Sequence, residues 1–129
     1  MAAGLATLKE LEQKRPYGAL QKKTKELCDF ISYSARENNV QVQVNSACGM
    51  FTVFFSEQPV HSYFDALLAS TEKFAVFFRE LLARGVYFPP SQFEAAFIST
   101  AHTGAVMAKA KKAIRGALAV VGKSRLANG

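Results

Sequence analysis

Apolar side chains recur at helical spacing in four parts of the chain. The first covers residues 2–13, and Pro16 then starts a second helix at its permitted first-turn position, running to about Glu37. A third helix has Ser70 as its N-cap and ends at Gly85, and a fourth covers residues 104–121. The four stripes are Leu5, Leu8 and Leu11; Leu20, Thr24, Leu27, Ile31 and Ala35; Phe74, Phe77, Phe78, Leu81 and Leu82; and Val106, Ala110, Ala113, Ile114, Ala117, Leu118 and Val121.

Between these helices the apolar period changes to that of strands. Residues 40–45 alternate and predict a half-buried strand, and Gly49 marks a turn. Residues 50–55 are apolar on nearly both faces and predict a more central strand. We also expect one or two helical turns at 63–69, a short extended piece at 86–88 and a strand at 95–100. This order predicts an α+β fold of two layers, with a small mixed or antiparallel sheet of three or four strands and helices packed on one face.

Composition narrows the class of protein. The 129 residues fit one domain, and a 50% hydrophobic and 20% charged content excludes intrinsic disorder. No apolar run approaches the ~18 residues of a membrane span, and the N-terminus lacks the basic region of a signal peptide. Two cysteines are too few for a disulfide framework, which favours a reducing compartment. We therefore expect a cytoplasmic, bacterial-like protein without a membrane partner.

The net charge of +6 is concentrated in the last helix and the tail. Residues 1–94 hold ten basic and ten acidic side chains, so the excess lies beyond Glu94. A basic helix is compatible with nucleic-acid binding, but no aromatic residues are interleaved for base stacking. We interpret it as a solvated helix face and expect no nucleic-acid partner. The excess cations are Lys109, Lys111, Lys112, Arg115, Lys123 and Arg125.

Motifs of catalysis are missing from the sequence. The possible metal ligands Cys28, Cys48, His61 and His102 lack metal-site spacing, so we predict no metal site. Neither a G-x-S-x-G nucleophile motif nor a glycine-rich phosphate loop occurs. The ten lysines lie near helix ends or on polar helix faces, whereas a Schiff-base lysine must be desolvated. We expect no catalytic, cofactor-binding or metal-binding residue in this chain.

One loop still points to a function. Pro89 and Pro90 hold residues 91–94 in a rigid, non-helical loop, and Glu94 is a lone carboxylate among apolar neighbours. Two interpretations remain open on these grounds. Glu94 is either a surface acid at the start of a strand or a carboxylate that the loop presents to a cleft.

The sequence around this loop carries a specific pattern. Tyr87, residues 89–94 and the run Ala101, His102 and Thr103 are hard to find together outside one family. The chain, to about Val121, resembles the C-terminal small domain of the glutamate-1-semialdehyde 2,1-aminomutases, which are pyridoxal-phosphate enzymes of the class III aminotransferase family. The other matching segments are residues 1–8, 49–55 and 59–60 with Tyr63 and Asp65, and residues 71–74 and 77–78.

The resemblance implies a fold, a partner and a site. The fold would be the small domain of fold-type I pyridoxal-phosphate enzymes, with residues 1–14 as an interdomain-type helix, 15–121 as the body and 122–129 as a flexible tail. The family's Schiff-base lysine lies in a large domain that precedes this segment, so the chain would be a fragment, a truncated gene product or a separately made domain. Glu94 would face the substrate, Ser91 and Gln92 would set its loop, and the assembled enzyme would be a dimer in porphyrin and chlorophyll biosynthesis.

Some positions depart from the family pattern. Cys48 stands where serine is usual, Ser70 where aspartate is common, and Gly104 to Val106 replace acidic residues that open the last helix. These changes bear on stability more than on identity. Two other functions remain open: the small domain of a different class III aminotransferase, and a stand-alone, non-catalytic interaction module. The chain alone is expected to be inactive and to bind no pyridoxal phosphate.

Overall fold

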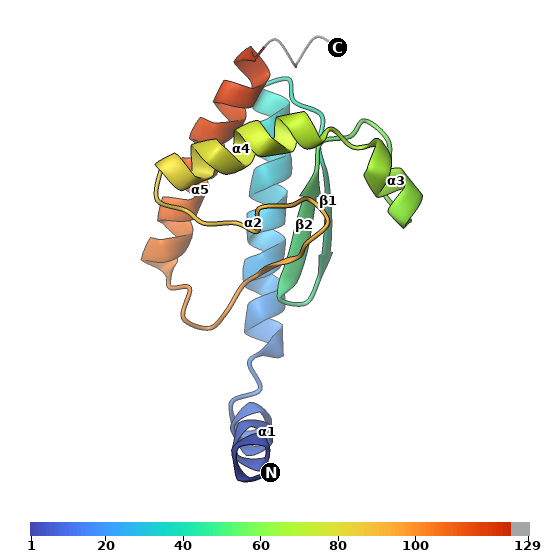
Figure 1. The fold of residues 1–129 in the computed structure, drawn as a ribbon. Coiled ribbons are helices and arrows are strands. Elements are labelled where there is room, and N and C mark those ends of the chain that lie inside the picture. Colours follow the sequence, from blue (N-terminus) through green and yellow to red (C-terminus); the bar gives the residue numbers. More distant parts are fainter. Residues whose placement is uncertain (125–129) are drawn as a thin grey trace.

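The computed structural model describes residues 1–124. It has the predicted α+β fold, with a three-stranded antiparallel sheet in the order β1-β2-β3. Helices α2, α4 and α5 gather on one side of the sheet, and α3 projects on the other side (Figure 1). The helices are α1 (Ala2–Lys14), α2 (Tyr17–Glu37), α3 (Tyr63–Leu68), α4 (Thr71–Ala83) and α5 (Gly104–Lys123), and the strands are β1 (Gln43–Ala47), β2 (Met50–Phe54) and β3 (Ala96–Phe97).

The first strand begins later than its alternating pattern predicts. The Val40 N–H donates to the Ala35 carbonyl at 2.9 Å, so Val40 closes the end of α2 and is buried there. The prediction that the strand starts at residue 40 is therefore wrong, although the hairpin is present. Ala47 pairs with Met50, which leaves Cys48 and Gly49 as the turn. Cys48 adopts the left-handed conformation at φ 49°.

The segment after α4 contains less strand than predicted. Only Ala96 and Phe97 pair with β2, because Gly49, the next residue opposite Ile98, already belongs to the turn between β1 and β2. Ile98 still donates its N–H to the Gly49 carbonyl, and the chain then turns at Ser99. The piece at 86–88 is not a strand of the sheet. Val86 instead donates its N–H to Leu81 at the end of α4, and Phe88 turns into the core.

One hydrophobic core holds the body together. Helix α5 packs on both α2 and α4, and α2 packs on the sheet, as the apolar stripes of these helices require. Phe77 of α4 has no exposed surface and contacts Phe55 and Phe88 edge-on. The other fully enclosed core side chains are Ile31, Ala35, Leu81, Ile114, Ala117, Leu118 and Val121.

Side-chain caps fix the starts of three helices. The Ser70 hydroxyl accepts the Lys73 N–H at 3.2 Å, which confirms the predicted N-cap of α4. Ser62 and Asp65 form a capping box at α3, and Thr103 caps α5 through the Val106 N–H. These short polar residues supply the acceptors that the first turns lack.

The ends of the chain differ in how they pack. Helix α1 lies apart from the body (Figure 1), has no buried residue and exposes Leu5 and Leu8. It is separated from α2 by Arg15, which adopts the left-handed conformation at φ 41°.

Helix α5 continues to Lys123, so residues 122 and 123 of the predicted tail are helical. Residues 125–129 of that tail lie outside the described residues. None of the described helices is long and apolar enough to cross a membrane.

The last turn of α5 gives a test of this packing. A Cβ on Gly122 would overlap the Asn38 carbonyl oxygen at the end of α2, whereas a Cβ on Gly104 of the same helix meets no atom within 4 Å. We expect Gly122→Ala to lower the free energy of unfolding by about 1–3 kcal/mol, since overpacking forces backbone shifts. Gly104→Ala should leave it unchanged or slightly raised in urea unfolding, and equal effects of the two changes would contradict this contact.

Candidate functional site

The loop that carries Glu94 is a compact turn tied to β2. The Ser91 hydroxyl accepts the Phe93 N–H at 3.2 Å, and the Ser91 carbonyl accepts the Glu94 N–H at 3.2 Å. Thr52 of β2 donates its hydroxyl to the Glu94 carbonyl at 3.2 Å. The main chain at Glu94 is thus held from within the loop and from the neighbouring strand.

Gln92 is the buried anchor of the loop. Its side chain is only 2% exposed, and Nε2 donates to the carbonyls of Ala66 and Ala69 at 3.1 and 3.3 Å. These carbonyls lie at the end of α3, so Gln92 joins the loop to that helix. Its Oε1 is also buried but has no hydrogen-bond partner among the described residues. The structure places the Gln92 side chain inside the protein, two residues from the exposed Glu94.

The Glu94 side chain is exposed and borders a pocket of about 450 Å³. Among residues 1–124 its carboxylate has no ion pair and no side-chain hydrogen bond. A carboxylate with no partner in its own chain is available to a ligand or to another domain. The pocket is lined by Asn45, Thr52, Phe54, Val60, His61, Ser62, Tyr63, Ala66, Gln92, Phe93, Glu94 and Ala95.

The opposite wall of this pocket is fixed by the start of α3. One oxygen of Asp65 accepts the N–H groups of His61 and Ser62 at 3.0 and 2.9 Å. The His61 hydrogen bond, followed by that of the Ser62 hydroxyl, lowers the pKa of Asp65 below its ordinary value. Asn45 of β1 donates to the Val60 carbonyl at 2.7 Å and holds the preceding loop. Asn45 and Thr52 carry no signal in the sequence, because only the strand pairing brings them to the site.

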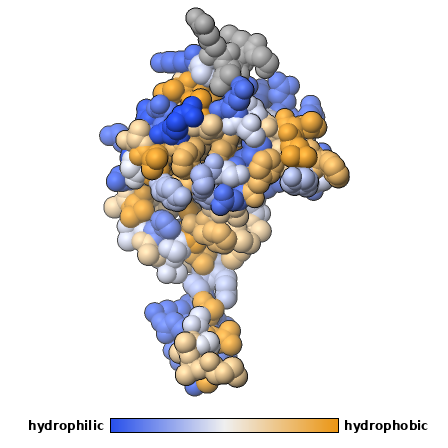
Figure 2. Space-filling view, viewed as in Figure 1, coloured by the Kyte–Doolittle hydropathy of each residue, from blue (hydrophilic) through white to orange (hydrophobic). Residues whose placement is uncertain are grey.

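An apolar rim surrounds the carboxylate. The rings of Tyr63 and Phe93 pack against each other at the pocket, with their centroids 6.0 Å apart, and both side chains are exposed. Phe64, Leu67 and Leu68 extend this surface along α3, whose projecting end is largely apolar in Figure 2. The site therefore combines one free negative charge with a broad exposed hydrophobic surface.

The other candidate chemical groups are spread over the protein. No three His, Cys, Asp or Glu side chains within residues 1–124 gather as metal ligands. Burial raises the pKa of the Cys28 thiol, while Cys48 is exposed. His102 lies in the loop before α5, where its Nδ1 accepts the Ser99 N–H at 2.9 Å. All ten lysines lie within the described part of the chain, and each is at least partly exposed.

Known proteins are similar to this chain in sequence and in fold. A glutamate-1-semialdehyde 2,1-aminomutase from Desulfitobacterium hafniense (strain DSM 10664 / DCB-2) is 48% identical over 105 residues, covering 81% of this chain and 24% of that protein. The aminomutase of the same name from Anaeromyxobacter dehalogenans (strain 2CP-1 / ATCC BAA-258) is 45% identical over 123 residues, covering 95% and 28%. No family model matches the sequence. The chain thus spans about a quarter of the length of these relatives.

A solved structure supports the fold independently. The crystal structure of an omega-transaminase from Sphaerobacter thermophilus superposes with a TM-score of 0.78 at 21% sequence identity. The match covers 90% of this chain and 26% of the transaminase chain. The predicted likeness to a domain of an aminotransferase fold is thereby confirmed.

Two nearby positions in the loop, one buried and one exposed, allow a paired test. Glu94→Gln removes an unpartnered exposed charge, and we expect the melting temperature to stay the same or rise slightly. Gln92→Glu places a carboxylate against the carbonyls of Ala66 and Ala69, and it should destabilise the fold by about 3 kcal/mol or more. Thermal unfolding followed by circular dichroism measures both. A clear loss of stability in Glu94→Gln would show that Glu94 serves the fold.

Proposed function

The chain belongs to the glutamate-1-semialdehyde 2,1-aminomutase family, and we propose that it forms the C-terminal small domain of such an enzyme. The whole protein would convert glutamate-1-semialdehyde to 5-aminolevulinate on pyridoxal phosphate, in tetrapyrrole synthesis. The observation that carries this proposal is the 42–48% identity to aminomutases across 81–95% of the chain. The two cysteines without a disulfide support a location in the reducing cytoplasm.

The residues described do not fit the cofactor by themselves. Pyridoxal phosphate requires a desolvated lysine and a cradle of N–H groups for its phosphate, and it supplies the electron sink for amino transfer. Every lysine of this chain has solvent-exposed surface. We infer that the remainder of the protein holds the cofactor and that the chain alone is inactive.

We assign the substrate-facing role in the assembled enzyme to Glu94. Its carboxylate is unpartnered at the pocket edge, and the hydrogen bonds of Ser91 and Gln92 set the loop that presents it. When the large domain covers the apolar rim, the loop would close the substrate site and exclude water. Ser91 and Gln92 act as positioning residues in this proposal.

Two other functions retain some support. The likeness to an omega-transaminase also fits the small domain of a different class III aminotransferase. The exposed apolar residues of α1 and α3 also fit a non-catalytic module that binds another protein. Aminomutase activity in an assembled enzyme distinguishes the proposed aminomutase domain from both of these alternatives.

The proposed function is tested in a chimera. The chain replaces the matching segment of the Desulfitobacterium hafniense relative, and formation of 5-aminolevulinate is measured. We expect an active chimera, and we expect Glu94→Gln to lower kcat/KM about tenfold or more, as for loss of a group at the reacting site. Glu57→Gln, the same change at another exposed position, should leave turnover unchanged. A chimera that binds the cofactor and transaminates other amines only would favour the alternative aminotransferase.

The unjoined chain serves as the control. With pyridoxal phosphate and borohydride we expect slow labelling spread over exposed lysines, and no 5-aminolevulinate. Stoichiometric labelling of a single lysine would contradict the inference that the cofactor site lies outside this chain.

We also propose that the chain self-associates through α1. Leu5 and Leu8 are exposed on a helix without buried residues, and exposed apolar stripes favour partners. We expect a homodimer or a concentration-dependent oligomer in sedimentation, and Leu5→Lys with Leu8→Lys should shift it to monomer. Thr7→Lys adds one positive charge to the same helix without removing a leucine, and it serves as the control. A monomer at high concentration would contradict the proposal.

A further inference from the structure

A second pocket lies between α2, α5 and the chain segments that flank the Glu94 loop. Its volume of about 490 Å³ falls within the ~300–1,000 Å³ range of small-molecule sites. Ser91, Gln92 and Glu94 do not line it, and Ala95 is its one lining residue in common with the pocket at Glu94. Its apolar walls are formed by Leu27, Phe51, Val86, Tyr87, Phe88, Ile98, Val106 and Met107.

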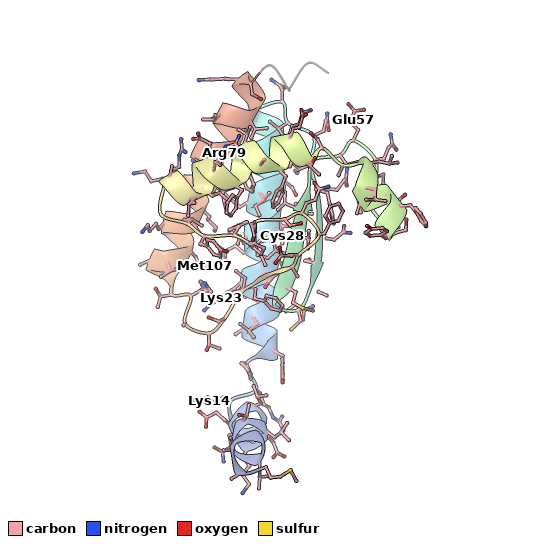
Figure 3. All side chains as sticks on the ribbon, in the orientation of Figure 1. Lys14, Lys23, Cys28, Glu57, Arg79 and Met107 are labelled. Carbon is pink, nitrogen blue, oxygen red and sulfur yellow. The ribbon has the colours of Figure 1, made fainter. Side chains whose placement is uncertain are left out.

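Hydrogen bonds hold the mouth of this pocket in place. Lys23 of α2 donates to the His102 carbonyl at 2.8 Å and ties the loop before α5 to α2. Ile98 donates to the Gly49 carbonyl at 2.7 Å and fixes the other side. Met107 points from α5 towards α2 above Lys23 in Figure 3. The cavity is thus built by the fold before any ligand arrives.

Two polar groups at the pocket are available to a ligand. The Ser99 N–H donates to His102 Nδ1 at 2.9 Å, with the Ser99 hydroxyl at 3.0 Å from the same nitrogen. In the neutral ring the proton therefore sits on Nε2, which has no partner among residues 1–124.

The second group is Lys109 of α5. Its ammonium lies beside Gly85, 3.4 Å from the place that a Cβ on this residue would occupy, and both residues line the pocket. Among the residues described it makes no ion pair, and no acidic side chain lines the pocket. The cavity thus offers a cation and an N–H donor above an apolar interior.

We propose that this pocket binds a small carboxylate with an apolar body, whose head meets Lys109 and the Nε2–H of His102. The tail would lie against Phe51, Phe88 and Met107, where it removes apolar surface from water. A neutral ligand would leave the ammonium without a counter-charge, and an amine would be repelled by it. The charge and the lining together select an apolar anion.

Octanoate is a suitable probe, with 1-octanol as its uncharged counterpart. Calorimetry on the full chain should show saturable 1:1 binding of octanoate with a Kd below about 1 mM. Lys109→Gln should weaken octanoate binding about fivefold or more and leave octanol unchanged, since a charge-assisted contact is lost. Lys112→Gln removes the same charge from the same helix, outside the pocket, and should have little effect.

A second variant tests the location independently. Ala110 lines the pocket, and Ala110→Phe should fill it and reduce binding of both probes while circular dichroism shows the fold intact. Absence of saturable octanoate binding would overturn the proposal. Equal weakening by Lys109→Gln and Lys112→Gln would also overturn it, because attraction would then come from the basic helix as a whole. Undiminished binding in folded Ala110→Phe would place the ligand elsewhere and reject the site.

Discussion

The arrangement of the protein depends on a chain of aromatic contacts centred on Phe77. Its ring lies edge-on to Phe55 and Phe88, with centroids 5.5 and 6.0 Å away, and Phe88 meets Phe51 at 5.6 Å. These contacts join α4, the strand β2 and the segment that leads into the Glu94 loop. Such pairs contribute about 0.5–1.5 kcal/mol each beyond the area they bury. Because Phe88 directly precedes Pro89 and Pro90, the core sets where the loop begins.

The loop is then closed by the buried amide of Gln92. Its Nε2 gives two hydrogen bonds to the end of α3, to the carbonyls of Ala66 and Ala69. A leucine of similar size would leave these two carbonyls without their donors, and an unpaired buried acceptor costs about 1–3 kcal/mol. The amide thus fixes the distance between the loop and α3, which together enclose the pocket at Glu94.

Local pattern predicts the helices well because their apolar stripes meet one core. The stripes of α2, α4 and α5 supply most of the buried residues, and the Ser70 cap was evident from sequence. The strand limits depended on distant partners. Val40 continues an alternating pattern but bonds to Ala35. Strand β3 ends at Phe97 because Gly49, the residue opposite Ile98, lies in the turn between β1 and β2.

The site was predictable only in part, for a similar reason. The prolines and the lone carboxylate indicated the Glu94 loop, and the family resemblance gave it a role. The burial of Gln92 could not be read from sequence, since its partners lie 23 and 26 residues earlier in the chain. A glutamine between a serine and a phenylalanine gives no local sign of whether its side chain will be buried or exposed.

The surroundings of Glu94 constrain what must cover it. Tyr63 and Phe93 border the pocket, so any domain that seats on this apolar rim also removes water from the carboxylate. Desolvating an ionised carboxylate is costly unless hydrogen-bond donors or a cation replace the lost water. No Lys or Arg of the described residues lines this pocket, and no salt bridge among them involves Glu94. A surface that docks here must therefore bring hydrogen-bond donors or a positive charge to the Glu94 carboxylate, or bind a ligand that supplies them. The fold leaves this carboxylate exposed at the pocket edge for such a partner.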